Sequence, residues 1–330
     1  MANVEPYSLS FWEILATSVA KMGPIPEHIA IIMDGNRRYA RAKGLKTVLG
    51  HEAGSSVTTL LAQWVEAIGC KELTLYAFSS ENFKRTEKEV EDVMDVIYRK
   101  VGLMIRAVDT GKNTSMCFQV IGNWDSIPLK LKFRLANLMQ KTKNFKPYKL
   151  NVAVGYTGRE GILRSLKEFE GQKSDKKMTN VNDSFEMIPP IKWNEYLLEQ
   201  AQNLVDMRPV DMLIRTGGDL RLSDFMLWEA SHAYVHFIPT TWPEFSFTDF
   251  IHAIFMYQLH RSRVPKRLSA KQSLSPEVML LAEKMLQAGR TEKWAKIARL
   301  GKRDVPPETS EPDYVPNQFM KRFEALLNFN

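Results

Sequence analysis

The chain has 330 residues, of which 44% are apolar, which is enough for one large packed domain or two smaller ones. Its net charge of +7 would suit nucleic-acid binding only if the positive charge were spread over a surface. Instead, residues 261–330 carry 14 Lys and Arg against 8 Asp and Glu, and the remainder carries 31 basic and 30 acidic residues. We therefore expect no nucleic-acid partner. The basic end is either a solvated face or a contact with anionic lipid or another subunit.

The two cysteines, Cys70 and Cys117, are too few for a disulfide framework or a zinc site. We expect both to be reduced and structural, in a protein that faces the cytosol. No apolar run approaches the roughly 18 residues that cross a bilayer. No basic segment followed by an apolar one marks a signal peptide.

Residues 1–23 are predicted to form an amphipathic N-terminal helix. Ser10 and Glu13 match a capping box, and Gly23 with Pro24 ends the helical pattern. The helical pattern has one apolar stripe, formed by Leu9, Phe11, Trp12, Ile14, Leu15 and Val19. Such a stripe indicates either a helix packed on the rest of the protein or an interfacial helix or lid beside an apolar site.

The segment 28–33 reads as a buried strand that ends at Asp34. A helical pattern with Arg37 and Arg38 follows, so a carboxylate stands beside a helix N-terminus, which binds anions. Arg38 lies about one helical turn after Asp34 and can face the same ligand. Mg²⁺ would join the carboxylate to a phosphate. The alternative is a helix cap followed by two solvated arginines.

Strand and helix patterns alternate along the rest of the chain. Further strands are predicted over residues 71–79, 116–122, 149–156, 210–214 and 233–238. Helices are predicted over residues 50–69, 87–108, 128–141, 159–169, 192–203 and 248–260, with a loop over 171–182. This alternation predicts an α/β domain over residues 24–262, with a mostly parallel central sheet and helices on both faces.

Residues 263–330 are predicted to form a basic C-terminal tail that is partly helical and partly flexible. Two short helices are expected over residues 276–288 and 291–300, separated by Gly289. A Pro- and acid-rich connector over residues 304–316 and a short amphipathic helix over residues 317–329 follow.

Three polar segments follow predicted strands: one at Asp34, one over residues 79–85 and one over residues 215–224. Ligands of parallel sheets bind at the carboxyl ends of the strands, so we expect the three segments to meet there. They contain Asp34, Arg38, Ser79, Asn82, Arg85, Arg215, Arg221 and Ser223. Together with helix N-termini after Asp34 and near His51, such a set can hold two diphosphates and one Mg²⁺, because guanidinium groups match phosphate oxygens.

Several enzyme classes lack their signatures in this sequence. It has no P-loop, no dinucleotide-binding fingerprint and no recognisable Ser/His/Asp set. For residues 215–221 the alternative to a phosphate site is a Gly-rich turn without a ligand.

In these motifs and their order, the chain resembles the cis-prenyltransferase family, from about residue 24 to residue 261. The matching segments are 28–38, 50–51, 76–85, 214–228 and 242–244. The pair Arg37 and Arg38 and the leading segment around Trp12 are most similar to the eukaryotic subunits of dehydrodolichyl diphosphate synthase.

The resemblance implies a cis-prenyltransferase fold and a Mg²⁺-dependent transferase. The enzyme would condense isopentenyl diphosphate repeatedly onto farnesyl diphosphate and make a long-chain polyprenyl diphosphate for dolichol synthesis and protein glycosylation. Asp34 would hold Mg²⁺, and Asn82 with Ser79 would orient the reacting groups. The allylic diphosphate would contact Gly35, Asn36, Arg37, Arg38, His51 and Arg85. Isopentenyl diphosphate would contact Arg215, Arg221 and Ser223.

Three positions depart from the family pattern. Thr47 stands where bacterial relatives carry an arginine, and Tyr234 stands where they carry a second metal-binding carboxylate. Their C-terminal Arg-x-Gly motif is missing, and residues 261–265 do not replace it. The resemblance implies that a Nogo-B-receptor-type subunit supplies that motif. We therefore expect a heteromer on the cytosolic face of the endoplasmic reticulum membrane, attached peripherally.

Two other functions stay open. The chain could be a non-catalytic scaffold subunit of the same complex, although such a subunit would not need Asp34, Arg38 or Asn82. It could also be a phosphate-binding or phosphatase-like α/β protein.

Overall fold

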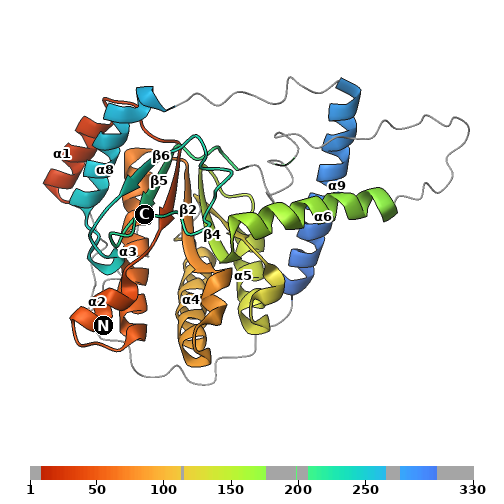
Figure 1. Cartoon of the computed structure of the whole chain (residues 1–330), viewed down its shortest axis with the longest axis horizontal. Coiled ribbons are helices and arrows are strands. Elements are labelled where there is room, and N and C mark those ends of the chain that lie inside the picture. Colours follow the sequence, from red (N-terminus) through yellow and green to blue (C-terminus); the bar gives the residue numbers. More distant parts are fainter. Residues whose placement is uncertain (1–8, 113–114, 176–197, 199–206, 265–275, 303–330) are drawn as a thin grey trace, which may run out of the picture.

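The computed structural model describes residues 9–112, 115–175, 198, 207–264 and 276–302. Six parallel strands form one sheet in the order β3-β4-β2-β1-β5-β6 (Figure 1). The strands are β1 (His28–Ile32), β2 (Glu72–Ser79), β3 (Met116–Ile121), β4 (Tyr148–Tyr156), β5 (Met212–Arg215) and β6 (Tyr234–Phe237). This confirms the predicted α/β class with a parallel sheet.

Strand β1 lies in the middle of the sheet, and all five of its residues are buried. It pairs with β2 on one side and β5 on the other, with Ile32 opposite both Tyr76 and Arg215. The ends of these three strands therefore lie next to one another. A continuous apolar run is expected for a strand covered on both faces.

The helices connect the strands and cover the sheet. They are α1 (Phe11–Ala20), α2 (Asn36–Ala42), α3 (Thr47–Ile68), α4 (Glu87–Asp109), α5 (Leu129–Thr142), α6 (Gly158–Asp175), α8 (Phe247–His260) and α9 (Pro276–Gly301). Residues of α3, α4, α5 and α8 form the larger core with one face of the sheet. A smaller core on the other face contains Ile32, Tyr76 and Leu213, packed on Phe225 and Met226.

Three boundaries differ from the prediction. Helix α3 begins at Thr47, three residues earlier than expected, and α6 continues to Asp175, into the predicted loop. Helix α9 is continuous through Gly289, so the two-helix prediction is wrong. Its contacts with α5 and α6 stabilise the helix, and Ile297 is buried in the larger core, which outweighs the weak helix propensity of one glycine. The predictions for residues 304–316, 317–329 and, apart from residue 198, 192–203 lie outside the described residues.

Helix α1 has the predicted Ser10–Glu13 capping box, and it combines a packed face with an exposed apolar one. Its buried residues are Thr17 and Ala20, and it packs against α3 and α8. Trp12 is 73% exposed, and the rest of the apolar stripe except Leu9 is also exposed. The helix therefore packs on the body through its small residues and leaves its large apolar side chains outward.

Two further sequence predictions can be compared with the structure. Cys70 and Cys117 are both free and buried. In the described part of the chain, no helix combines the length and apolar character required to cross a bilayer.

A buried polar network joins three strands at the amino edge of the sheet. His28 Nε2 lies 2.7 Å from Thr74 Oγ1, and Asn151 Nδ2 donates to Thr74 Oγ1 at 2.9 Å. Asn151 Nδ2 also donates to Glu72 Oε1 at 2.7 Å, and Glu72 is 1% exposed. A buried carboxylate is tolerated only when hydrogen bonds replace its lost hydration.

Replacing Asn151 should therefore destabilise the sheet. Asn151→Leu removes a donor from buried Glu72, and we expect the free energy of unfolding to fall by about 1–3 kcal/mol in urea titrations. The exposed Asn144→Leu is the matched control and should stay within about 0.5 kcal/mol of the wild type. Equal stability of the two variants would contradict this account of the network.

Candidate active site

The residues selected from the sequence for catalysis, substrate binding or metal binding all line one cavity. They come from the segments that follow β1, β2 and β5 and from α3. These residues are Asp34, Gly35, Asn36, Arg37, Arg38, His51, Ser79, Asn82, Arg85, Arg215, Arg221 and Ser223. The structure thus brings together loops that are far apart in sequence, as the parallel topology requires, while the individual roles remain predictions.

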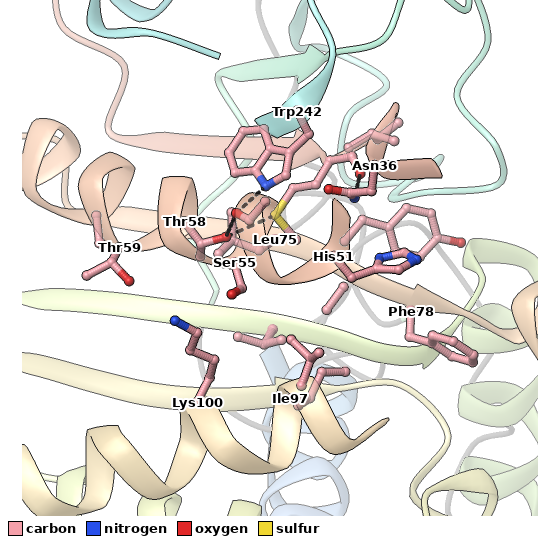
Figure 2. Close-up of a pocket in the computed structure, with 18 of the residues that line it drawn as sticks. Asn36, His51, Ser55, Thr58, Thr59, Leu75, Phe78, Ile97, Lys100 and Trp242 are labelled. Carbon is pink, nitrogen blue, oxygen red and sulfur yellow. Dashed lines mark hydrogen bonds between the residues drawn. The ribbon is translucent and has the colours of Figure 1, made fainter. Parts of the chain in front are cut away.

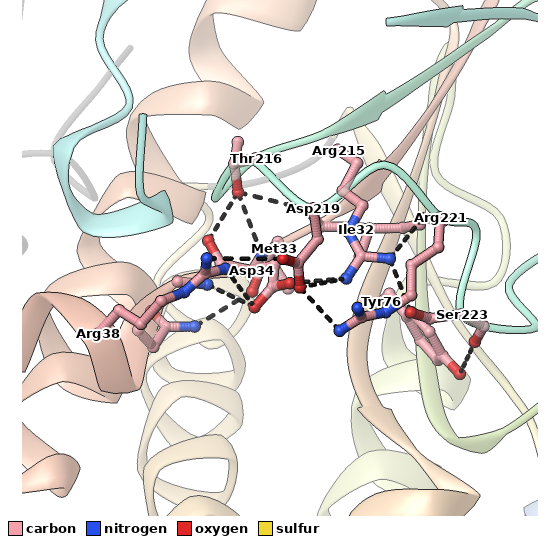
Figure 3. A network of polar contacts seen from close by, with 12 residues as sticks. Ile32, Met33, Asp34, Arg38, Tyr76, Arg215, Thr216, Asp219, Arg221 and Ser223 are labelled. Carbon is pink, nitrogen blue, oxygen red and sulfur yellow. Dashed lines mark hydrogen bonds and ion pairs between the residues drawn. The ribbon is translucent and has the colours of Figure 1, made fainter. Parts of the chain in front are cut away.

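Asp34 and Arg215 form the central ion pair of the cavity rim (Figure 3). Arg215 Nη2 donates to Asp34 Oδ2 at 2.7 Å, and the Arg215 side chain is only 2% exposed. The Gly35 amide donates to Asp34 Oδ1 at 2.7 Å. Burial raises the pKa of Asp34, but the hydrogen bond and charge of Arg215 outweigh burial, so that the pKa lies below its ordinary value. Asp34 is therefore ionised at neutral pH.

Asp219 is a second carboxylate in this network, and the sequence analysis did not select it. It accepts from Arg221 Nη2 at 2.7 Å and from Arg215 Nη2 at 3.4 Å. Arg38 lies 3.7 Å from Asp219 and 3.4 Å from Asp34. In Figure 3, Arg38 approaches the two carboxylates from one side, and Arg215 and Arg221 approach from the other. The only signal in the sequence was an acidic residue between two selected arginines.

The loop after β5 positions Arg221 and Ser223. Three non-glycine residues in it have positive φ angles between 46° and 58°: Ser223, Asp224 and Met226. Such angles cost on the order of 1 kcal/mol each and persist only when surrounding contacts impose them. Phe225 supplies such a contact, because it is fully buried and stacks on Tyr76 with centroids 4.4 Å apart. In this conformation Ser223 Oγ accepts from Arg215 Nη1 at 2.7 Å.

A second group of cations lies between α2 and the start of α4. Arg85 Nη1 donates to Glu89 Oε1 at 3.0 Å, and Arg37 Nη1 lies 3.6 Å from the same oxygen. Glu89, in the first turn of α4, was also missed from the sequence, where it resembles an ordinary helix-start carboxylate. Burial and the charge of Arg37 lower the pKa of Arg85. This second group thus contains two arginines that share one carboxylate.

His51 lies beside the second group. Because α3 begins at Thr47, His51 is in the second turn of the helix and not at its N-terminus, as the sequence had suggested. Burial and the charge of Arg85 lower the pKa of His51 to about 4, so the imidazole is neutral. Its Nε2 and the Nε of Arg215 are buried without a hydrogen-bond partner among the described residues. Orphaned polar atoms of this kind are rare, and at a cavity they mark positions that a ligand can satisfy.

Ser79 and Asn82 form a reciprocal cap at the start of the short helix η1 (Ser80–Lys84). The Asn82 amide N–H donates to Ser79 Oγ at 3.2 Å, and the Ser79 amide donates to Asn82 Oδ1 at 3.1 Å. This cap fixes the orientation of Asn82 and leaves its Nδ2 without a protein partner within the described part of the chain. Ser79 thus holds the side chain of Asn82 in place.

Gly35 and Asn36 shape the turn between β1 and α2. Gly35 has φ +105°, and a Cβ there would lie 2.8 Å from Thr241, so only glycine fits. Asn36 Nδ2 donates to the Met33 carbonyl at 3.2 Å. Its Oδ1 packs against Gly54, where a Cβ would come within 2.1 Å. Asn36 therefore connects α2 closely to α3.

The three departures from the family pattern lie away from this rim. Thr47 is exposed at the first residue of α3. Tyr234 pairs with Met212 at the amino end of β5, whereas Arg215 lies at the carboxyl end. Arg261 begins the short helix η4 (Arg261–Arg263) after α8 and does not line the cavity. A carboxylate in place of Tyr234 would therefore not reach Asp34 within this chain.

Below the rim, the cavity continues between α3 and α4 (Figure 2). Its volume is about 1640 Å³, more than the roughly 300–1,000 Å³ of most small-molecule sites. Apolar residues of α4 line this part of the cavity and also contribute to the larger core. The apolar lining includes Leu75, Val93, Val96, Ile97, Val101, Met104, Met116, Phe118, Leu135, Leu150 and Val152.

The low pKa of His51 predicts a pH dependence of stability. Between about pH 6.5 and pH 4 the unfolded chain binds a proton at His51 that the folded chain does not bind, so acidification favours unfolding. We expect this residue to account for up to about 3 kcal/mol of the loss in unfolding free energy over that range. Urea titrations of His51→Asn should show a shallower loss than the wild type. The exposed His232→Asn is the control, and identical slopes for all three proteins would contradict the assignment.

Comparisons with known proteins agree with this geometry. Residues 32–265 match the family described as "Putative undecaprenyl diphosphate synthase". The human dehydrodolichyl diphosphate synthase complex subunit is 33% identical over 295 residues, which cover 88% of this chain and 86% of the human protein. A tritrans,polycis-undecaprenyl-diphosphate synthase (geranylgeranyl-diphosphate specific) of Thermoplasma acidophilum is 34% identical, over 76% of this chain and 93% of the archaeal one.

A solved structure gives the same result for the fold. Lavandulyl diphosphate synthase from Lavandula x intermedia, crystallised in complex with dimethylallyl diphosphate, superposes with a TM-score of 0.63 at 26% identity. The match covers 71% of this chain and 95% of that one. Shared motifs, a shared fold and a rim of arginines around one apolar cavity lead to one conclusion: this chain is a transferase of the undecaprenyl diphosphate synthase family, the cis-prenyltransferases.

Proposed function

We propose that this chain is the catalytic subunit of a dehydrodolichyl diphosphate synthase. It adds isopentenyl diphosphate repeatedly to farnesyl diphosphate and forms a long-chain polyprenyl diphosphate with cis double bonds. The observation that carries the proposal is the pairing of two arginine groups at the rim of one large apolar cavity. Two anionic head groups and one apolar chain require this combination of surfaces.

The two arginine groups suit two different diphosphates. Arg215, Arg221 and Ser223 form the group around Asp34 and Asp219, and we assign isopentenyl diphosphate to it. Arg37 and Arg85, beside neutral His51, form the other, and the allylic diphosphate binds there. Arg38 pairs with Asp34 and Asp219 and follows Arg37 of the second group along α2, and Gly35 and Asn36 hold the turn that carries it. The carboxylates keep the guanidinium groups oriented before substrate arrives, which lowers the cost of binding.

Asp34 is the residue that would hold Mg²⁺. Its carboxylate is ionised, 30% exposed and fixed in orientation by Arg215 and Gly35, which fits a metal ligand. One carboxylate does not fill an octahedral shell, so diphosphate oxygens and water must provide the other ligands. Asp34 would hold Mg²⁺ where the ion would stabilise negative charge on the departing diphosphate.

The remaining polar residues of the site orient the substrates, and the apolar residues protect the allylic cation from water. The Nδ2 group of Asn82, held in place by Ser79, can donate to a substrate oxygen and set the geometry for proton loss. The apolar cavity excludes water from an allylic cation and accepts the growing chain.

We also propose that the chain works with a second subunit at a membrane. The human relative is named as a subunit of a complex, and Arg261 and Arg263 do not supply the missing Arg-x-Gly motif at this cavity. A Nogo-B-receptor-type subunit would provide it. The outward apolar residues of α1, with Leu9 and Ile14 at the cavity, suit peripheral attachment to the cytosolic face of the endoplasmic reticulum. The product would then serve dolichol synthesis and protein glycosylation.

Removing the charge of Asp34 should abolish synthesis. Asp34→Asn keeps the size of the side chain but weakens Mg²⁺ binding, and we expect incorporation of labelled isopentenyl diphosphate to fall by at least about 100-fold. The assay uses the full chain with its partner subunit, farnesyl diphosphate and Mg²⁺, and circular dichroism checks folding. Asp95→Asn, on the exposed side of α4, should leave the rate unchanged. Near-normal turnover by Asp34→Asn would favour a scaffold role, and release of inorganic phosphate from simple phosphoesters would favour a phosphatase.

Replacing an arginine of one group should change the KM for one of the two substrates and not for the other. Arg221→Ala should raise the KM for isopentenyl diphosphate by about 10–100-fold, because a charge-assisted hydrogen bond is lost, and change the KM for farnesyl diphosphate little. Arg85→Ala should do the reverse. Steady-state kinetics with each substrate varied in turn tests both, with exposed Arg106→Ala on α4 as the control. If both variants raise the same KM, the division into two sites is wrong.

A further inference from the structure

The main chain of Asp34 is held by Thr216, which directly follows Arg215 at the end of β5. Thr216 Oγ1 donates to the Asp34 carbonyl at 2.9 Å and accepts from the Asp34 amide at 3.1 Å (Figure 3). The hydroxyl has one hydrogen, and Asp34 is its nearer acceptor, since the Ile32 carbonyl lies at 3.4 Å. Two consecutive residues therefore bind both parts of Asp34: Arg215 binds the carboxylate, and Thr216 binds the main chain.

Asp34 needs main-chain partners because β1 ends two residues before it, at Ile32. The Asp34 amide also donates to the Ile32 carbonyl at 3.1 Å, and the Asp34 carbonyl also accepts from the Trp242 amide at 2.8 Å. Each of these two groups thus has a main-chain partner besides the Thr216 hydroxyl. Loss of the hydroxyl would loosen Asp34 without leaving a buried polar group unpaired, so a variant without it should still fold.

The main chain after β5 approaches that of Asp34 closely. Gly217 has φ +87°, and a Cβ there would lie 3.0 Å from the Asp34 carbonyl group and 2.7 Å from Arg38 Nη2. Gly35, which follows Asp34, has φ +105°. Both angles are in the region that favours glycine. The Thr216 hydroxyl therefore joins two tight turns at the point where they touch.

The contacts of the Asp34 carboxylate differ from those of its main chain in one respect. In the free protein, the carboxylate pairs with Arg215 and Arg38 and is exposed to the cavity. In the proposed reaction, these groups exchange their contacts for contacts with a diphosphate and Mg²⁺. The hydrogen bonds of Thr216 go to main-chain atoms, so they persist through that exchange. A fixed main chain leaves only two side-chain dihedral angles to vary and limits where the carboxylate can lie.

On the basis of the proposed function, we propose that Thr216 is a positioning residue, which fixes the main chain of Asp34 so that the carboxylate keeps its place while its contacts change. Thr216 acts through Asp34, because it is fully buried and does not line the cavity. Displacement of a reacting group by about 1 Å can cost about 100-fold in rate. Loss of the hydroxyl should therefore lower kcat more than it raises either KM.

Substitutions at Thr216 isolate the hydroxyl group. Thr216→Val keeps the shape of the side chain without the hydroxyl, and we expect kcat to fall by at least about 10-fold while the KM for either substrate changes by less than about threefold. Thr216→Ser keeps the hydroxyl and should stay within about threefold of the wild type in kcat. The measurement is steady-state incorporation of labelled isopentenyl diphosphate by the full chain, purified with any subunit that its activity requires. If Thr216→Val does not fold, Thr216→Ala replaces it in the comparison with Thr216→Ser.

Thr142 provides a matched control for stability. It is also buried, and its Oγ1 donates to the Leu138 carbonyl at 2.9 Å and accepts from the Phe118 amide at 3.0 Å. Thr142→Val thus removes the same two kinds of hydrogen bond, from a residue that does not line the cavity. It should lower the free energy of unfolding in urea titrations but leave kcat unchanged. An equal loss of kcat in Thr142→Val and Thr216→Val would overturn the inference.

A binding measurement gives a readout that does not depend on turnover. Mn²⁺ is titrated into each protein with farnesyl diphosphate and without isopentenyl diphosphate, and free Mn²⁺ is followed by electron paramagnetic resonance against a protein-free control. We expect Thr216→Val to weaken Mn²⁺ binding by at least about threefold, since the carboxylate is less well placed. Thr216→Ser and Thr142→Val should match the wild type. Equal Mn²⁺ affinity in all four proteins would overturn the inference, whatever their rates.

These experiments distinguish the inference from the function on which it rests. If the wild type forms no isoprenoid product, the proposed function fails. If the wild type forms product and Thr216→Val matches Thr216→Ser in rate and Mn²⁺ affinity, only the role of Thr216 fails.

Discussion

Arg215 is nearly inaccessible to solvent, and its charge is compatible with that position because Asp34 faces it across the ends of two neighbouring strands. A buried guanidinium without such a carboxylate would be strongly destabilising. The pair also fixes the geometry of the rim, since Asp34 is shared with Arg38 and Arg215 with Ser223. The same contact therefore stabilises the sheet edge and orders the cationic surface that faces the ligand.

The carboxylates of the rim explain how so many arginines can lie together before a ligand binds. Asp219 lies among three of them, and Glu89 holds the other two. Repulsion between the cations is reduced, and each guanidinium group is already oriented toward the cavity. A diphosphate that enters exchanges contacts with these carboxylates for contacts with phosphate oxygens. Preorganisation of this kind stabilises developing negative charge without a large rearrangement.

Polar and apolar surfaces are separated along the cavity because α3 and α4 both begin at the carboxyl edge and run away from it. Their first two turns carry His51 and Glu89, and later turns carry residues such as Met104. Charge is thus concentrated where the strands end, and the apolar part of the cavity extends into the larger core.

The sequence by itself determined the parallel α/β fold, because buried strands and amphipathic helices differ in hydrophobic period, and it located the polar segments at strand ends. It did not identify Asp219 or Glu89 as counter-ions, because their side chains meet the arginines only after the loops fold together. It misjudged Gly289, where packing of α9 against α5 outweighs the local pattern, and it left open how α1 packs, which contacts with α3 and α8 decide. Tertiary structure alone decided which charges pair and where the cavity lies, because both depend on distances between residues that are remote along the chain.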